Sequence, residues 1–384
     1  MANPTTYAIP RKLWEHPDPE SSQLGQFRRR LERRTGLRFP TFHSLYDYSI
    51  THRAAFWDFC FRDLNPIHSG TYTTVVDETA RMDSIPRWFS GTHLNFAENM
   101  LFSPSSSPSS IACTTGKEDA KIALTEVREG GAEGARNVSW GELRRMVGRL
   151  AQAMKSAGVR RGDRAAVVAS NSVETLVVFL AVTALGGIFS SSSTDMGVKG
   201  ILDRLVQIRP RWLFMDDWTV YNGKTIDLRG KMEEVVKGME AEGVQEFQGV
   251  VAQPRFRGRP ADVSGVARTQ TLAEFLEKAS SDKLEFERVG FSDPFLIVYS
   301  SGTTGIPKCI VHSVGGVVLT GMKEGKLHRE IGSNSVAMQY TTTGWIMYLG
   351  GVQPLLHGCR VVLYDGSPFL PDTSFFMRLA GEQK

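Results

Sequence analysis

Apolar residues along the chain switch between helical and strand spacing from about residue 120 onwards. Ser139 and Glu142 form a capping box, a pair of side chains that satisfies the first free N–H groups of a helix. Apolar residues then recur every three or four positions as far as Gly158: Leu143, Val147, Leu150 and Met154. This pattern predicts a helix, and the short apolar run 164–169 after it predicts a buried strand.

The alternation continues beyond residue 170. The further predicted elements are a helix over 173–185 closed by two glycines, a strand over 188–191, a helix over 198–208 and a strand over 212–215. Strands and helices that alternate with such short connections build a parallel sheet with helices on both faces. We therefore expect an α/β fold of layered parallel sheets. Residues 222–285 are less regular and more charged, and we interpret them as peripheral elements that lead to a short helix over 271–279.

The first 100 residues are rich in aromatic side chains: Tyr46, Tyr48, Phe56, Trp57, Phe59, Trp88, Phe89 and Phe96. Such groups need a surface to pack against, which favours a folded extension docked on a larger body over a disordered tail. The serine-rich run 103–110 has too few apolar groups to order itself. The arginine-rich run 28–38 lacks the interleaved aromatic residues of a single-strand nucleic-acid binder, so we interpret it as a solvated helix face.

Composition excludes several classes of protein. Hydrophobic residues make up 41% of the 384 positions and the formal net charge is only +4, which is ordinary for a globular protein and does not indicate nucleic-acid binding. The longest apolar stretch, 175–189, is shorter than the roughly 20 residues of a membrane span and favours a buried helix. The four cysteines have no metal-binding spacing, and no secretory signal is recognisable. We therefore expect reduced thiols and a cytoplasmic location.

The candidate chemistry lies just after a predicted strand at 295–299. The strand leads into a loop of hydroxyl and glycine residues: Ser300, Ser301, Gly302, Thr303, Thr304 and Gly305. Lys308 follows and adds a cation. Hydroxyl donors, backbone N–H groups that can turn inward and a positive charge are what a polyphosphate requires. The Walker A pattern does not fit, because only two residues separate the glycines and Cys309 follows the lysine.

This loop resembles the signature loop of the adenylate-forming enzymes, and other segments narrow the resemblance. Residues 88–99 are similar to the segment that joins an N-terminal extension to the main domain in acetyl- and acetoacetyl-CoA synthetases. Residues 190–205, 340–348 and 365–368 resemble the acetoacetyl-CoA synthetase branch in particular. The resemblance implies that residues 1–100 are the N-terminal extension and that residues 101–384 are the first part of an AMP-binding domain.

The same resemblance implies a reaction. Acetoacetate and ATP would form acetoacetyl-adenylate and pyrophosphate, and CoA would then displace AMP. Ser300 to Thr304 and Lys308 would hold the β- and γ-phosphates together with Mg²⁺. The implied acyl pocket consists of Thr342, Thr343, Gly344 and Trp345, although Trp345 is also open to interpretation as ordinary core packing. Met347 and Tyr348 are interpreted as core residues. His312 is interpreted as structural or as a minor nucleotide contact, because an ionised carboxylate needs no general base to attack phosphorus.

Several family features do not occur in this sequence. They are the glutamate that holds Mg²⁺, the aspartate that binds the ribose and the small C-terminal domain with the catalytic lysine. We expect these groups beyond Lys384, no useful adenylation by residues 1–384 alone, and less than normal stability. Two alternatives remain open, namely a non-catalytic nucleotide-binding chain and a synthetase for another short-chain acid. The sequence indicates neither the residues that bind CoA nor the oligomeric state.

Overall fold

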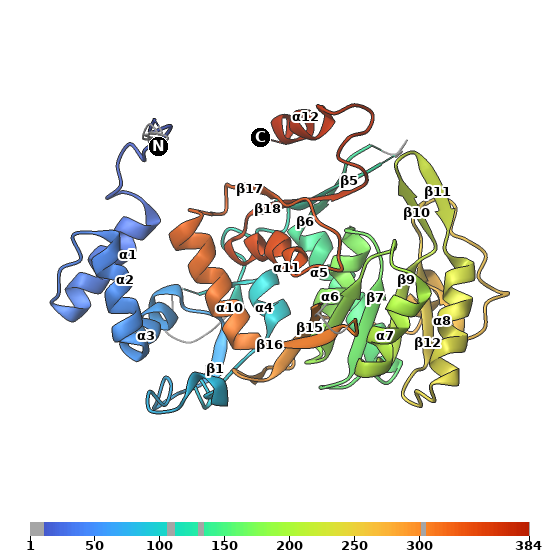
Figure 1. Cartoon of the computed structure of the whole chain (residues 1–384), viewed down its shortest axis with the longest axis horizontal. Coiled ribbons are helices and arrows are strands. Elements are labelled where there is room, and N and C mark those ends of the chain that lie inside the picture. Colours follow the sequence, from blue (N-terminus) through green and yellow to red (C-terminus); the bar gives the residue numbers. More distant parts are fainter. Residues whose placement is uncertain (1–10, 106–111, 130–133, 301–304, 384) are drawn as a thin grey trace, which may run out of the picture.

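The computed structural model describes residues 11–105, 112–129, 134–300 and 305–383. The N-terminal helices lie at one end of an elongated molecule, helices α7 (Val198–Ile208) and α8 (Arg229–Ala241) lie at the other, and the sheets lie between them (Figure 1). None of the described helices is long and apolar enough to cross a bilayer. Each of the four cysteines is a free thiol, as expected, and all of them lie within the described ranges.

The large sheet contains seven strands in the described part of the chain, in the order β13-β12-β9-β7-β8-β15-β16. Their bounds are Thr269–Thr271, Gly249–Gln253, Trp212–Asp216, Arg164–Val168, Ile188–Ser192, Pro294–Ser300 and Lys308–Ser313. The strands pair in parallel except at one edge, where β16 runs antiparallel to β15. The strands expected at 164–169, 188–191, 212–215 and 295–299 are confirmed as β7, β8, β9 and β15.

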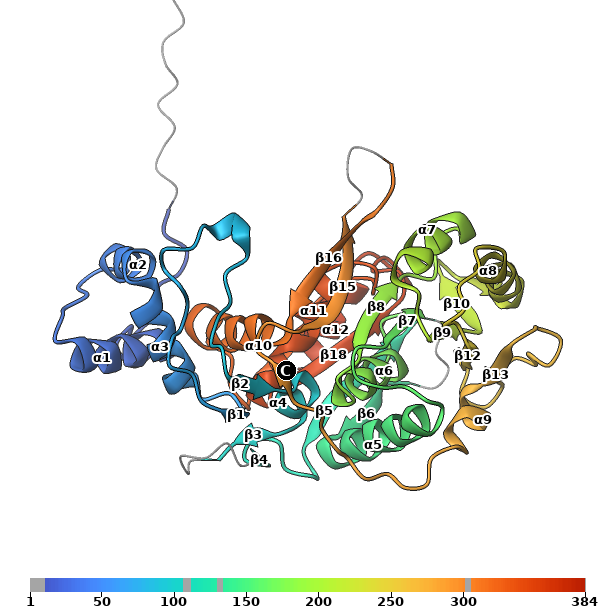
Figure 2. The same ribbon diagram turned by 90° about the horizontal axis from the view of Figure 1, so that it is seen from below.

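Helices cover both faces of the large sheet, as the sequence predicts. Helices α5 (Trp140–Ser156) and α6 (Val173–Ala184) belong to the core on one face, and α7 and α8 belong to the core on the other. Figure 2 shows the two pairs on opposite sides of the strands. Successive residues of β7 alternate between the two cores, since neighbouring side chains on a strand point to opposite faces. The apolar stretch 175–189 contributes most of α6, which is a buried core helix.

A smaller sheet packs against the first of these cores. It has the order β17-β18-β5-β6, and β6 is its antiparallel strand. The bounds are Val336–Met338, Arg360–Asp365, Ile122–Arg128 and Arg136–Ser139. The helical segments from residue 314 onwards are α10 (Val314–Lys323), η2 (Glu324–His328), α11 (Met347–Val352), η3 (Gln353–His357) and α12 (Phe375–Glu382), and η3 contacts β18.

The expectation of peripheral structure over 222–285 is wrong for its central part. Strand β12 lies inside the large sheet, between β9 and β13, and all five of its residues are buried. Helix α8 buries Met232, Val235, Val236 and Met239. Both elements carry the ordinary apolar signals of a strand and a helix, but the charged residues around them obscured those signals. Before them lies a hairpin of β10 (Trp218–Tyr221) and β11 (Lys224–Asp227). The helix expected over 271–279 is α9 (Leu272–Leu276), which starts at a capping box of Thr271 and Glu274.

The N-terminal residues form helices α1 (Gln23–Thr35), α2 (Phe42–Thr51) and α3 (Arg53–Leu64). Helix α1 buries Phe27 and Leu31. Arg33 and Arg34 are exposed, which agrees with a solvated helix face, whereas the arginines at 28–30 are half-buried and Arg30 forms an ion pair with Asp63 of α3. Part of the serine-rich run is ordered, because β3 (Ser103–Pro104) pairs with β4 (Ala112–Cys113). Residues 106–110 of that run lie outside the described residues.

Helix α4 (Phe96–Leu101) connects this extension to the body. Asn95 caps the helix by accepting from the Glu98 N–H at 3.0 Å, and its amide donates to Thr183 O at 2.7 Å and to Glu287 O at 2.8 Å. The Glu98 carboxylate forms a bidentate pair with Arg288, with both distances 2.7 Å. The fully buried Lys117 ammonium donates to three backbone carbonyls near the end of the helix, at 2.7–3.0 Å.

A small antiparallel sheet also joins the N-terminal extension to the body. Its strands are β1 (His68–Gly70), β2 (Thr92–Leu94) and β14 (Val289–Gly290). The segment that resembles the family's connecting motif therefore acts as a structural joint.

Candidate functional site

Strands β7, β8 and β9 end at the same edge of the large sheet, and a cavity of about 700 Å³ opens there. Its lining comes from the segments that follow these strands, from the β10–β11 hairpin, from the loop before α11 and from the end of β18. Ligands of open α/β sheets bind outside the carboxyl ends of the strands, so the position of this cavity is typical of a ligand site.

Thr343 is buried and fastens the loop before α11 to the large sheet. Its hydroxyl lies 2.7 Å from Ala169 O and 3.1 Å from Ser192 O, at the ends of β7 and β8. Its own carbonyl accepts a hydrogen bond from Ser191 Oγ at 2.6 Å. Thr343 is 1% exposed and does not line the cavity, whereas the preceding Thr342 is exposed and does.

The other predicted acyl-pocket residues lie beside this threonine. Gly344 packs against Ser193, where an added Cβ would lie 3.2 Å from the backbone nitrogen. Trp345 is 69% exposed and does not line the cavity, so the alternative interpretation of Trp345 as core packing is wrong. Tyr348 is a core residue as expected. Met347 is 46% exposed, contrary to expectation, because it lies in the outward-facing first turn of α11.

A buried ionic cluster lies behind the cavity. Asp216 accepts hydrogen bonds from Ser170 N at 2.8 Å and from Ser170 Oγ at 2.7 Å. Burial raises the pKa of Asp216 to about 7, although the nearby Arg128 opposes the shift. Asp365 lies 3.2 Å from Arg255 Nε, and burial raises its pKa against the pull of both arginines. Arg128 also lies 3.1 Å from Glu126.

One cavity-lining residue has a side-chain oxygen that is buried without a hydrogen-bond partner among the described residues, namely Asn171 Oδ1. Because buried acceptors are almost always satisfied, this oxygen indicates that a water or a ligand donor belongs in the cavity. Sequence reasoning missed the cluster, although Glu126 lies inside β5, and Asp216 and Asp365 directly end the apolar runs of β9 and β18, which could have indicated it.

Lys231 holds the loop after β8 in place. Its ammonium donates to Thr194 O at 2.6 Å and to Met196 O at 2.8 Å, and burial lowers its pKa. Asp195, in the same loop, lines the cavity and favours the charged form of Lys231. Asp203 has a different environment, since it pairs with Lys199 one turn away on α7.

The predicted phosphate loop is described only at its two ends. Ser301, Gly302, Thr303 and Thr304 lie outside the described residues. Ser300 ends β15 and Lys308 begins β16, and these two residues are register partners across the hairpin. Gly305 has φ +80°, a conformation that glycine adopts without strain. Gln207 Nε2 of α7 donates to Pro307 O at 3.0 Å and so fixes the hairpin base to the neighbouring helix.

Lys308 is exposed and has no ion-pair partner among the residues that the structure describes, so its charge is available to an anion. The end residues therefore fit a phosphate group. The described residues include no group of three histidine, cysteine, aspartate or glutamate side chains that could hold a metal ion. His312 lies in β16 and is half-buried, and burial lowers its pKa, which favours the neutral imidazole.

Comparison with known proteins identifies the family. The sequence model of the AMP-binding enzymes matches residues 114–384. The chain belongs to the AMP-binding enzyme family. A second family model, for the acetyl-coenzyme A synthetase N-terminus, matches residues 42–100.

Individual relatives of this family confirm the resemblance found in the sequence. The acetoacetyl-CoA synthetase of Gallus gallus is 38% identical over 94% of this chain and 52% of its own length. The malonamoyl-CoA synthetase of Penicillium aethiopicum is 36% identical over 93% of this chain and 48% of its own length. The solved acetoacetyl-CoA synthetase from Streptomyces lividans superposes with a TM-score of 0.83 at 30% identity, over 97% of this chain and 54% of that one. The chain thus spans about half the length of these relatives.

Proposed function

We propose that this chain supplies the phosphate site and part of the acid site of an ATP-dependent acid–CoA ligase that converts acetoacetate to acetoacetyl-CoA. The observation that carries the proposal is the combination of the hydroxyl- and glycine-rich loop ending in the exposed Lys308 with similarity to acetoacetyl-CoA synthetases over 94% of the chain. ATP and CoA are the proposed co-substrates. We also propose a cytoplasmic location, because the free thiols fit a reducing compartment.

The proposed chemistry has two steps. An acetoacetate oxygen attacks the α-phosphorus of ATP, a new P–O bond forms, and the bond to pyrophosphate breaks. The CoA thiolate then attacks the acyl carbon and AMP leaves. Negative charge accumulates on the phosphates in the first step, so fixed donors and a cation that are in place beforehand lower its barrier. Lys308 and the hydroxyls from Ser300 to Thr304 would have this role. Mg²⁺ would add further neutralisation when bound, and its glutamate ligand is expected beyond Lys384.

The acid site is proposed at the loop before α11. Thr342 and Trp345 have exposed side chains there and are the proposed contacts. Gly344 lets the loop lie close to Ser193, and the Thr343 hydroxyl holds the loop through its hydrogen bond to Ala169 O. One observation supports malonamate as an alternative acid, because the similar Penicillium protein is a malonamoyl-CoA synthetase. Malonamate and acetoacetate both carry a carbonyl group at the same distance from the carboxylate.

ATP binding tests the phosphate site directly. We expect Lys308→Ala to weaken ATP binding to the 384-residue chain at least about tenfold, measured by isothermal titration calorimetry, because a phosphate loses a charged partner. Lys199→Ala is the matched control, since Lys199 is an exposed lysine that pairs with Asp203 on α7. Equal affinities of the two variants would refute the assignment of Lys308.

Turnover separates the remaining alternatives. The intact mass of the native protein is determined first, and ATP–pyrophosphate exchange is then measured on that native protein with acetoacetate, malonamate, acetate, propionate and butyrate. Exchange that depends on acetoacetate supports acetoacetate as the substrate. Faster exchange with another acid would identify that acid as the substrate instead. If the native protein has an intact mass of 42.6 kDa and binds ATP without catalysing exchange, the result would favour a non-catalytic nucleotide-binding chain.

A further inference from the structure

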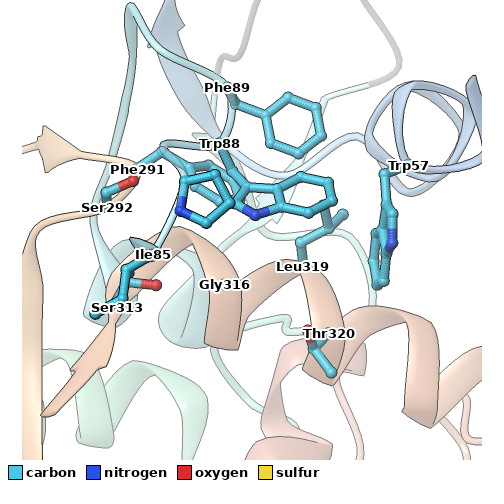
Figure 3. A pocket seen from close by; sticks show the side chains of 11 residues that line it. Trp57, Ile85, Trp88, Phe89, Phe291, Ser292, Ser313, Gly316, Leu319 and Thr320 are labelled. Atoms are coloured by element: carbon cyan, nitrogen blue, oxygen red, sulfur yellow. The ribbon is translucent and has the colours of Figure 1, made fainter. Parts of the chain in front are cut away.

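A second cavity, of about 400 Å³, lies where the N-terminal extension meets the body (Figure 3). Helix α3 and the segment before β2 form one wall, with Trp57, Trp88 and Phe89. The residues before β15 and helix α10 form the other, with Phe291 and Leu319. The cavity is separate from the one at the carboxyl edge of the large sheet, because the two share no lining residue.

The aromatic walls are preformed. The Trp57 and Trp88 rings meet edge-on, with centroids 6.3 Å apart and planes at 78°. Phe89 and Phe291, from the two opposite walls, have centroids 4.8 Å apart. Phe89, Phe291 and Leu319 are between 1% and 6% exposed, so the surrounding core fixes these side chains. A cavity with such walls does not need to reorganise to accept an apolar molecule, and its volume lies within the range of about 300–1,000 Å³ for small-molecule sites.

The lining carries no charged side chain, and its polar side-chain groups are three hydroxyls and the indole N–H groups of Trp57 and Trp88. Ser292, Ser313 and Thr320 line the cavity, and the Ser313 hydroxyl makes no capping hydrogen bond to helix α10. Lys323 is the nearby cation, 6.0 Å from the centre of the Trp57 ring, but its ammonium is paired with Glu324 at 2.5 Å. These features favour a neutral ligand that offers a hydrogen-bonding group to one side of the cavity.

The backbone of the extension is strained where it lines the cavity. Ile85 has φ +51° and Phe89 has φ +46°. Positive φ is rare for a β-branched or bulky residue, and it persists only where surrounding structure enforces it. Ile85 is also 86% exposed at the rim, so a large apolar side chain is held in solvent beside the opening. Such outliers cluster at ligand sites, which agrees with the chemistry of the walls.

We propose that this cavity binds an uncharged, largely apolar small molecule with an aromatic or branched aliphatic body and one or two hydrogen-bonding groups. The ligand would contact the segment matched by the acetyl-CoA synthetase N-terminus model and the AMP-binding domain at once. Binding would therefore stabilise the joint between them. The site is independent of the acid, the ATP and the CoA of the proposed reaction.

The uncharged dye N-phenyl-1-naphthylamine tests the proposal, because its fluorescence rises in apolar surroundings. We expect saturable binding of one dye per chain and a higher melting temperature in its presence, since a ligand of the native state stabilises it. The anionic analogue 1-anilinonaphthalene-8-sulfonate is expected to bind more weakly, because no unpaired cation lines the cavity. The filling variants Thr320→Phe and Ser292→Phe change exposed positions on two different elements of the second wall and should each weaken dye binding at least about tenfold.

Trp345→Ser is the control, since it removes an exposed aromatic side chain outside the cavity and should leave dye binding unchanged. Circular dichroism verifies that each variant is folded, and either filling variant suffices if the other does not fold. Three results would overturn the proposal: no saturable dye binding, binding that survives a folded filling variant, or binding that Trp345→Ser abolishes. Binding that disappears as the protein concentration rises would also overturn it, because a second copy of the chain would then cover the cavity.

Discussion

Replacement of Thr343 by valine tests the account of the candidate site most directly. Valine has nearly the same shape as threonine, so the variant removes the hydroxyl and leaves the packing almost unchanged. In the native protein this hydroxyl lies 2.7 Å from Ala169 O and 3.1 Å from Ser192 O. Ser192 O keeps a second partner in the variant, because it also accepts from Ala169 N at 3.2 Å. Ala169 O would be left buried and without a donor.

The magnitude follows from that one orphaned carbonyl. A buried acceptor that loses its partner reduces the free energy of unfolding by about 1–3 kcal/mol, so we expect a loss of about 2 kcal/mol for Thr343→Val. Thr343→Ser keeps the hydroxyl and loses a methyl group, which should reduce stability by only about 1 kcal/mol. Thr342→Val changes an exposed neighbour of the same type, and its effect should stay within about 0.5 kcal/mol.

Urea unfolding followed by circular dichroism and by tryptophan fluorescence measures these differences. With a slope of about 3 kcal/mol per molar urea, the midpoint for Thr343→Val should fall by about 0.7 M while the slope is unchanged. The order of stability should be Thr342→Val, then Thr343→Ser, then Thr343→Val. If the two valine variants unfold at the same urea concentration, the hydroxyl of Thr343 does not fasten the loop and the reasoning is wrong.

Three further variants test other parts of the molecule. Burial raises the pKa of Asp216 in the folded protein from 3.8 to about 7, so the native state keeps a proton that the unfolded state releases, and stability is lost as pH rises through this window. Relative to Asp216→Asn, the wild type should lose up to about 4 kcal/mol of its free energy of unfolding between pH 4 and pH 8, measured by urea titration. A difference between the two proteins that does not change with pH would contradict the assignment. Lys117→Met removes the hydrogen-bond donors to three backbone carbonyls and should reduce the free energy of unfolding by about 3 kcal/mol or more in the same assay. The control Lys155→Met removes an exposed ion pair with Glu285 and should change the free energy of unfolding by no more than about 0.5 kcal/mol. Asn95→Ala removes a helix cap and two tertiary hydrogen bonds and should reduce stability by about 3 kcal/mol; a loss below about 1 kcal/mol would show that the cap alone matters.

The parts of the fold that the sequence predicts are those whose signals are local. Helix α7 has the predicted bounds because Ile201, Leu205 and Ile208 form one buried stripe that ends where Arg209 turns the chain. Strand β5 lacks such a signal, because it contains Glu126 and Arg128 and its partner β18 lies more than 200 residues away. These charges are tolerated inside the protein because Arg128 forms ion pairs with Glu126, on the same strand, and with Glu174 of α6. That arrangement exists only after folding.

The candidate site shows the same division. The loop from Ser300 to Lys308 is recognisable because its residue types and order are themselves the signal. Thr342 and Thr343 are identical side chains at neighbouring positions, yet one lines a cavity and the other is buried. The difference depends on carbonyl groups at the ends of β7 and β8, which are more than 140 residues earlier in the chain. Residue type alone therefore predicts that the segment matters, and the fold decides which residue contacts the ligand.

The separation of the hydrophobic cores by the large sheet has a consequence for motion. The core under α7 and α8 is built from residues between 166 and 309, whereas the core on the other face also contains Phe27, at one end of the described chain, and Leu363, near the other. Opening the α7–α8 layer would expose one face of the strands without separating the N-terminal extension from the body. Amide hydrogen exchange should therefore divide the protein into two cooperative units, with the backbone of α7 and α8 exchanging through a smaller opening than the backbone of α4 and α6. Lys231 and Gln207, which hold the ligand-facing loops, lie on the more easily opened unit.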